Sequence, residues 1–451
     1  MSLSGLLNIA RSGMMAQSGA LSITGQNVTN ATTPGYTKRV ASMDAQIGGG
    51  VVFNGEIRTF DKFAYAHVVD QSGRLASASA RANALARIEA IIAPPSQTIG
   101  DRSTALMTSF TTLTAYPTDP AVRTDVLAKA DDLATTVATA ALSLSETSKE
   151  ILQQAQGVVT EINDRLGHVA DLNTKIAEAK AQGSDASALR DQRDQWVREI
   201  GDRVGVRAVE DPQGRVTLFG AGAVLVEGSQ TSPMSLDLDT AGKLRVTVSG
   251  ASTIDITSRV DSGTLGGLRE ARDVDLAKAR SGLDAFAFDV ANKINAVHAG
   301  GFGLDGGTGR PLFAVSATQA GAAASMALDP NMRDRPDRVG AGGSASELPG
   351  GNGAAMQLAQ LSDTDSFGGT TLANRFAALA GDVGARKASA EAEKTMRQDT
   401  LSLAQTMSDS ASGVSLDEEM VDMSKYQRAF EASSKVLRTA DELLANFLKD
   451  I

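Results

Sequence analysis

The fold is decided by the end of the chain, residues 416–451, which read LDEEMVDMSKYQRAFEASSKVLRTADELLANFLKDI. Apolar residues recur there at every seventh position, and others stand three residues after the middle members. This period places them in one narrow stripe of a helix, which normally needs cover from a second helix. No proline or glycine interrupts the run, and acids occupy its first turn, where the helix dipole favours them. We call this stripe the C-terminal seam; its residues are Leu416, Met423, Tyr426, Phe430, Leu437, Ala440, Leu444, Phe447 and Ile451.

A weaker stripe near the start of the chain is the expected partner. Its apolar residues alternate spacings of four and three, but glycines interrupt it, and each costs a helix about 1 kcal/mol relative to alanine. Burying a large apolar side chain yields about 1.5–3 kcal/mol, while ordering each backbone residue costs about 1–2 kcal/mol. We therefore expect both ends to depend on neighbouring copies; the alternative is a monomeric coiled coil that only staples the chain. This N-terminal seam is Leu3, Leu7, Met14, Leu21 and Val28.

Composition excludes several classes of function. The chain has 451 residues, a net charge of −10 and no cysteine. The acidic net charge argues against nucleic-acid binding, which would need a clustered basic surface. The absence of cysteine excludes disulfides and thiolate metal sites. No stretch is long and apolar enough to cross a bilayer, so no membrane insertion is expected. The amino terminus lacks a basic region and an uninterrupted apolar core, so it is not a Sec signal, although export by another route stays open.

The pattern along the chain predicts a mainly α fold with an inserted β domain. Paired terminal helices form a coiled coil, long helices form a middle bundle, and residues 204–260 alternate as short antiparallel strands. A rod with both ends at one pole satisfies this nested order. Helices are expected near 61–92, 101–116, 119–180, from 188 onward, 266–298 and 371–408, with a hairpin within 38–60 and a glycine-rich region at 299–353. The predicted domains are 1–45 with 409–451 (terminal coiled coil), 46–202 with 262–408 (helical wall) and 203–261 (outer β domain).

No residues suggest catalysis, a cofactor or a metal site. His67, His168 and His298 lie far apart and in no ligand spacing, which favours structural or solvent-facing roles. The glycine-rich run 301–309 lacks the lysine of a phosphate loop and the acids of a calcium loop, so a surface turn is expected. The charged run Arg190–Asp194 leaves two alternatives open, an interface or pairs within one helix.

The loop after the first helix resembles a family signature. Residues 30–36 read NATTPGY, with Pro34-Gly35 typical of a type II turn. This stretch, with Asn30, Pro34, Gly35 and Tyr36, is similar to the loop of the bacterial flagellar axial proteins, which build the rod, hook and hook-associated segments. Finer motifs resemble the members of this family at the hook–filament junction: SGVSLDEEM at 412–420, KYQRAF at 425–430, TADELL at 439–444, PTDPAVR at 117–123, LRDQRD at 189–194, GGL at 266–268 and NAVH at 295–298.

The resemblance implies a structural, non-enzymatic subunit. Such a protein would be secreted unfolded through the flagellar type III export apparatus, add to the hook tip and polymerise into a short tube. Its partners would be other copies of itself, the hook subunit, the second hook-associated protein towards the filament, and a cytoplasmic export chaperone on the C-terminal seam. The alternatives are another axial protein of the hook or distal-rod type, a cytoplasmic coiled-coil scaffold and, least favoured, an enzyme.

Overall fold

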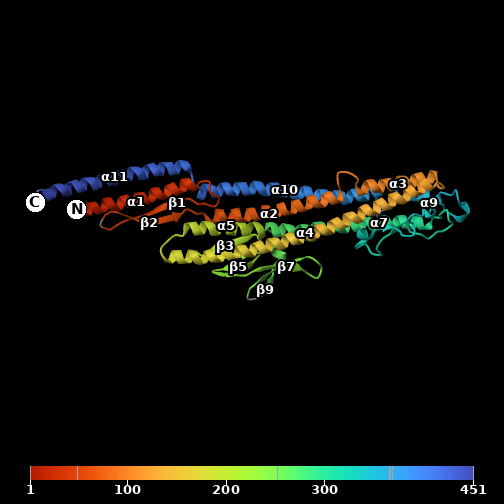
Figure 1. The fold of residues 1–451 in the computed structure, drawn as a ribbon, viewed down its shortest axis with the longest axis horizontal. Coiled ribbons are helices and arrows are strands. Elements are labelled where there is room, and N and C mark those ends of the chain that lie inside the picture. The colour runs from red at the N-terminus through yellow and green to blue at the C-terminus, as the bar shows by residue number, and fades with distance from the viewer. Residues whose placement is uncertain (1, 48, 251, 365–366, 368, 450–451) are drawn as a thin grey trace.

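The protein is a rod with both ends of the chain at the same pole (Figure 1). The computed structural model describes residues 2–47, 49–250, 252–364, 367 and 369–449. At that pole α1 (Leu3–Asn30) and α11 (Leu416–Lys449) lie side by side and run in opposite directions. The mainly helical fold with paired terminal helices and an inserted antiparallel β region is confirmed.

Long helices form the body of the rod, which we call the helical wall. Its longest member begins where the sequence predicts, with the Asp119 carboxylate accepting from the Ala121 N–H at 2.7 Å and Pro120 at the first helical position. At 1.5 Å per residue, its 62 residues span about 93 Å. The wall helices are α2 (Lys62–Ile92), α3 (Ile99–Ala115), α4 (Pro120–Ala181), α5 (Ser187–Val204), α6 (Gly263–Glu270), the π-helical turn Ala271–Leu276, α7 (Ala277–Gly300), α9 (Gly353–Gln360) and α10 (Leu372–Ser412).

One apolar cluster runs through the wall and into the β region. Leu133, Val137, Leu144 and Ile151 form one apolar stripe of α4 that is fully buried. Alanines between these residues are also buried, which lets neighbouring helices approach closely despite the low aromatic content.

Two small antiparallel sheets lie along α4. Asn173 exchanges hydrogen bonds of 2.8 Å with the backbone of Val216, and Asn163 exchanges bonds of 2.8 and 2.9 Å with that of Met234. Each sheet is therefore bonded to α4 through its own asparagine, Asn173 for the first sheet and Asn163 for the second. The strand order is β3-β4-β5-β6 in one sheet and β7-β8-β9 in the other. The strands are β3 (Val206–Glu210), β4 (Val216–Gly220), β5 (Ala223–Glu227), β6 (Gln230–Thr231), β7 (Met234–Leu238), β8 (Leu244–Ser249) and β9 (Thr253–Asp255).

The glycine-rich region packs on the wall rather than standing free. It contains the short antiparallel pair β10 (Phe313–Ala314) and β11 (Ala327–Leu328) and the short helix α8 (Ala322–Ser325). Buried Arg123 of α4 donates to the carbonyl of Val339 at 2.6 Å, and the ring of His298 bridges Arg310 and Gly340.

A β-hairpin packs against the first of the two terminal helices. β1 (Arg39–Ala45) pairs with β2 (Val51–Arg58), and both strands lie against α1. The domain boundary expected after residue 45 falls in the turn of this hairpin, so residues up to Arg58 group with the chain ends. We call α1, β1, β2 and α11 the terminal unit. Among the residues described, no helix has the length and apolar character needed to span a membrane.

His298 should make stability depend on pH. Its ring is buried; Nε2 accepts the Gly340 N–H at 3.0 Å, so Nδ1 carries the proton and donates to the Arg310 carbonyl at 2.8 Å. Burial lowers the pKa of His298 below its ordinary value of 6.5, and the nearby Arg123 and Arg310 act in the same direction. The unfolded chain therefore binds this proton more readily than the folded chain.

We expect the free energy of unfolding to fall as the pH drops below about 6.5, as measured by denaturant titration between pH 7.5 and 5.5. A His298→Asn variant should lose most of this dependence, whereas His67→Gln, at an exposed position, should keep it. Equal pH dependence in the wild type and His298→Asn would contradict this prediction.

Candidate functional site

The two helices that carry the predicted seams pack on each other within one chain. In the C-terminal seam Ala440 is fully buried, and Met423, Tyr426, Phe430, Leu437 and Leu444 are half-buried. The N-terminal seam residues Leu3, Leu7, Met14, Leu21 and Val28 are half-buried as well. Leu416 is 51% exposed and is not covered. Phe447 lies in α11, but its side chain is outside the described residues, as is Ile451.

The most deeply buried face of α1 carries mainly small and polar residues, which give little hydrophobic signal. Ala10 and Thr24 continue the predicted spacing of four and three from Leu3, whereas Ala16, Ala20 and Asn27 lie outside the predicted stripe. Two glycines explain the close packing: a Cβ on Gly13 would lie 3.0 Å from the Ser433 Oγ of α11, and one on Gly19 would lie 2.8 Å from the Phe53 ring of β2. The buried residues of α1 are Ala10, Ala16, Ala20, Ile23, Thr24 and Asn27.

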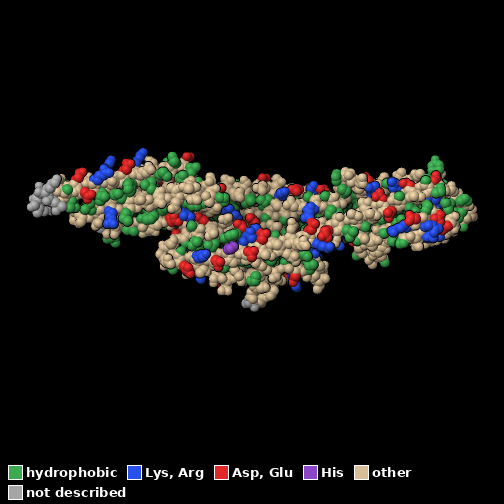
Figure 2. Space-filling view, viewed as in Figure 1, with side chains coloured by type: hydrophobic (Ala, Val, Ile, Leu, Met, Phe, Trp, Pro, Cys, Tyr) green, Lys and Arg blue, Asp and Glu red, His purple; other side chains and the backbone are tan. Residues whose placement is uncertain are grey.

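Large apolar side chains remain uncovered on α11. Met420 and Val421 are 65% and 68% exposed, and Val436 and Leu443 are 40% and 50% exposed. Figure 2 shows hydrophobic side chains over the surface of the terminal unit. Exposed large apolar side chains on one helix make it a candidate for protein–protein contacts.

A polar group is buried where the terminal pair meets the first loop. The Asn27 amide donates to a Glu419 carboxylate oxygen at 2.9 Å and accepts from the Tyr36 hydroxyl at 2.8 Å. Burial is the largest influence on Tyr36 and raises its pKa above the ordinary value. Lys38 donates to Glu418 at 2.7 Å, and this hydrogen bond raises the pKa of Lys38. Tyr36 of the signature loop is thus bonded to α1 and linked to α11 through the Asn27 amide.

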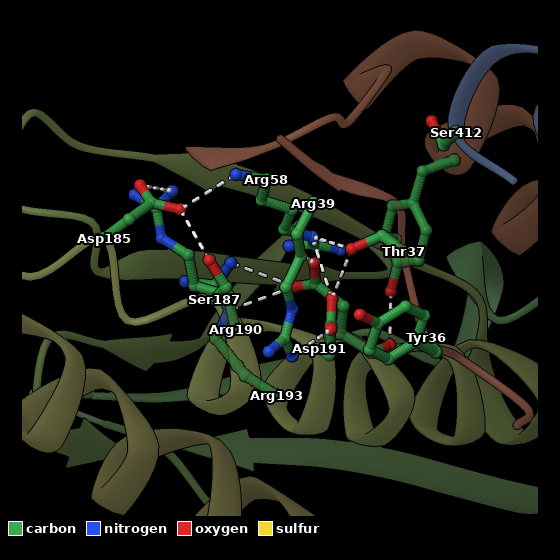
Figure 3. Close-up of polar contacts among 12 residues, drawn as sticks. Tyr36, Thr37, Arg39, Arg58, Asp185, Ser187, Arg190, Asp191, Arg193 and Ser412 are labelled. Atoms are coloured by element: carbon green, nitrogen blue, oxygen red, sulfur yellow. Dashed lines mark hydrogen bonds and ion pairs between the residues drawn. The ribbon is translucent and has the colours of Figure 1, made fainter. Parts of the chain in front are cut away.

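The terminal unit meets the wall through charged side chains (Figure 3). Arg58 of β2 contacts Asp191 at 2.9 Å and Asp194 at 2.7 Å, and the Thr37 hydroxyl donates to Asp191 at 2.7 Å. Burial raises the pKa of Asp191, although the Arg58 guanidinium and the Thr37 hydroxyl favour its charged form. Of the two alternatives for the run 190–194, the interface is therefore present.

The same run of α5 also reaches the β region. Arg190 pairs with Glu210 of β3 at 2.7 Å, and buried Arg193 donates to the carbonyl of Gly214 at 2.7 Å. Arg193 also pairs with Asp194 at 2.9 Å. One turn of α5 thus contacts the terminal unit on one side and the β region on the other.

Within the described part of the chain, no buried apolar cluster joins the terminal unit to the wall. The chain passes between the terminal unit and the wall twice, after β2 and after α10, and hydrogen bonds join these two segments. Ser412 accepts from the backbone N–H groups of Lys38 and Asp61, each at 3.0 Å. A cavity of about 280 Å³ lies beside them, lined by residues that include Tyr36, Arg58 and Ser412.

The other candidate positions are structural where they are described. His168 stacks on Trp196, and Asp305 accepts from the Gly307 N–H and pairs with Arg310, which makes a surface turn of the run 301–309. No group of three or more histidine, aspartate or glutamate residues in the described ranges is arranged to hold a metal ion.

Replacing Arg58 should weaken the junction. An Arg58→Met variant leaves Asp191 and Asp194 with side chains only 11% and 8% exposed and without this partner. Breaking a buried pair costs about 3–5 kcal/mol, so we expect lower thermal stability and faster proteolysis near residues 59–62. The exposed pair of Arg245 with Asp237 gives a matched control, and Arg245→Met should leave both measurements unchanged. Equal behaviour of the two variants would rule out a stabilising role for Arg58.

Comparisons with known proteins agree with this architecture. Residues 85–313 match the family model of the flagellar hook-associated protein FlgK helical domain. Residues 7–37 match the flagella basal body rod protein model, and 405–449 match the C-terminal model of the flagellar basal body rod FlgEFG proteins.

Individual proteins similar to this chain are named flagellar hook-associated protein 1. Flagellar hook-associated protein 1 of Salmonella typhimurium is 29% identical over 330 residues, which are 69% of this chain and 60% of that relative. The protein of that name in Escherichia coli K12 is 23% identical over 98% of both chains.

A solved structure, the flagellar hook junction protein FlgK from Burkholderia pseudomallei, shares the fold. Its TM-score is 0.68 at 16% identity, covering 76% of this chain and 99% of that chain. Because the FlgK helical-domain model alone matches just over half of the residues, the chain belongs to the family of the flagellar hook-associated protein FlgK.

Proposed function

We propose that this protein is a structural subunit of the bacterial flagellum that polymerises at the hook tip and joins the hook to the filament. The observation that carries the proposal is the combination of matches along one chain, with rod-type sequences at both ends and the hook-associated helical domain between them. The names of its relatives support the same role, because they are called hook-associated protein 1 and hook junction protein.

Polymerisation is assigned to the outer face of the terminal unit. Because α1 packs on α11 within one chain, the seams would act indirectly, by holding the two terminal helices together. The face of α11 that carries Val421, Val436 and Leu443 is left for neighbouring copies in a tube. Covering such side chains removes apolar area from water and yields about 25 cal/mol per Å².

The same face accounts for the proposed partners before and after assembly. During export through the flagellar type III apparatus, a cytoplasmic chaperone would shield these side chains of α11. In the secreted, assembled state the neighbours would be other copies, the hook subunit on one side and the second hook-associated protein on the other. The proposed role is structural and not enzymatic, in keeping with the family.

A second candidate is a rod or hook subunit, which the matches at residues 7–37 and 405–449 favour. Electron microscopy of a strain lacking the gene separates the two roles. Loss of a junction subunit leaves complete hooks without filaments and flagellin in the medium, whereas loss of a rod or hook subunit leaves no complete hook.

Complementation of that strain tests the assembly face. A Val436→Asp variant places a charge in the proposed contact and should restore few or no filaments, because a buried unpaired charge is strongly unfavourable. Lys435→Asp introduces the same side chain at the adjacent exposed position and should restore filaments. Leu437→Asp and Phe430→Asp should also fail, but with loss of helical protection in α1 and α11.

The outcome is read from filament counts together with limited proteolysis of the secreted proteins. Normal filaments with Val436→Asp would contradict the assigned face. Normal filaments with Leu437→Asp and Phe430→Asp would contradict the role of the seam in holding the terminal helices together.

A further inference from the structure

The apolar contacts between α1 and α11 leave their register poorly defined. Large residues of the C-terminal seam repeat every seven positions, at Met423, Phe430, Leu437 and Leu444. α1 carries a heptad repeat of its own, at Leu7, Met14, Leu21 and Val28, and its Gly13 faces Ser433 of α11. A slip of one heptad would therefore replace each contact by a similar one, and regular apolar repeats specify register weakly without a polar residue among them.

Two observed contacts define the register that the structure adopts. Asn27 bonds Glu419, and Gly13 faces Ser433, so fourteen residues separate the two contacts on each helix. A one-heptad slip would move Asn27 opposite Tyr426 in one direction or beyond the start of α11 in the other. Either slip leaves the Glu419 side chain, which is 2% exposed, without its amide partner.

Contacts outside α11 hold the Asn27 side chain in one orientation. Its Nδ2 donates to the Arg39 carbonyl at 2.8 Å, and its Oδ1 accepts from the Arg39 N–H at 3.1 Å and from the Tyr36 hydroxyl. The remaining Nδ2 hydrogen points to Glu419. Tyr36 is placed by the predicted turn, in which its N–H donates to the Thr33 carbonyl and Gly35 has a φ of 82°.

We infer that Asn27 and Glu419 are positioning residues that set the register of the terminal pair, with Tyr36 and Arg39 orienting the amide. The apolar residues hold the helices together, while this polar pair selects one alignment. Since the alignment decides which side chains of α11 face outward together with those of α1, it also fixes the surface presented to a neighbouring molecule.

Disulfide trapping can read this register directly, because the chain has no cysteine of its own. A Cβ at residue 13 lies 3.7 Å from the Ser433 Cβ, within the disulfide range of about 3.5–4.5 Å. A Gly13→Cys/Ser433→Cys chain therefore reports the observed register. Gly13→Cys combined with Ala440→Cys or with Tyr426→Cys reports a slip of one heptad in either direction.

In the full-length chain with Asn27 and Glu419 present, we expect the 13–433 cross-link to form and the other two to be negligible. In an Asn27→Leu/Glu419→Met background we expect loss of most of the 13–433 cross-link and a gain of the 13–440 or 13–426 cross-link. Helical content by circular dichroism should stay unchanged, since the apolar contacts remain.

Two controls separate register from general stability. Thr24→Val replaces another buried polar residue of α1 and should leave the 13–433 cross-link intact. Glu419→Gln keeps an oxygen acceptor for the Asn27 amide and should also retain the observed register, which a purely electrostatic role would not allow.

An unchanged 13–433 cross-link in the Asn27→Leu/Glu419→Met background would overturn the inference, because apolar packing would then set the register alone. Loss of all three cross-links would also overturn it, because the polar pair would then be needed for cohesion. Cross-linking is measured on isolated chains, so a result that overturns the register inference does not contradict the proposed junction role. Conversely, a complementation result that contradicts the junction role does not bear on the register.

Discussion

The antiparallel contact between α1 and α11 joins the two ends of the chain, and the remaining elements lie where this contact allows. It brings both termini to one pole, so the chain must return along the wall as many times as it runs out. The small residues and glycines of α1 permit this contact on one face and the β1–β2 hairpin on another. A helix that looks poor by itself is thus suited to being packed on two sides.

The attachment of this terminal unit to the wall is of a different physical kind. Arg58, Thr37 and Arg39 meet Asp191 and Asp194 of α5, and no described apolar cluster crosses the boundary. Charged contacts are directional and depend on their partners, whereas apolar packing gives cohesion without direction. The orientation of the terminal unit therefore depends on a few side chains.

The sequence predicted most of the fold because the decisive signals are local. The heptad repeat of α11, the Asp119-Pro120 start of α4 and the alternating segments from 204 to 260 each depend on neighbouring residues only. The turn at Pro34-Gly35 was predicted for the same reason. The expected boundary after residue 45 divides the two strands of the hairpin, because local signals indicate where strands lie but not which neighbouring domain they pack against.

The buried contacts of α1 with α11, including the Asn27–Glu419 hydrogen bond, could not be predicted from the sequence, for two reasons. Asn27 and Glu419 are separated by 392 positions, and neither stands in a motif that points to the other. Ala16 and Ala20 are fully buried, but alanine favours a helix at any position, so its presence alone does not show which face is covered. Leu416 continued the heptad by spacing yet lies beyond the end of the contact, because the first turn of α11 carries the polar contacts of Glu418 and Glu419 with Lys38 and Asn27.

Hydrogen exchange of the isolated chain in dilute solution, followed by mass spectrometry, tests the central claim that the terminal unit is one cooperative body, separate from the wall. The account predicts that α1, the β1–β2 hairpin and α11 exchange together, and much faster than the buried stretch of α4 around Leu144. Equal protection of the terminal helices and α4, or independent exchange of α1 and α11, would contradict it.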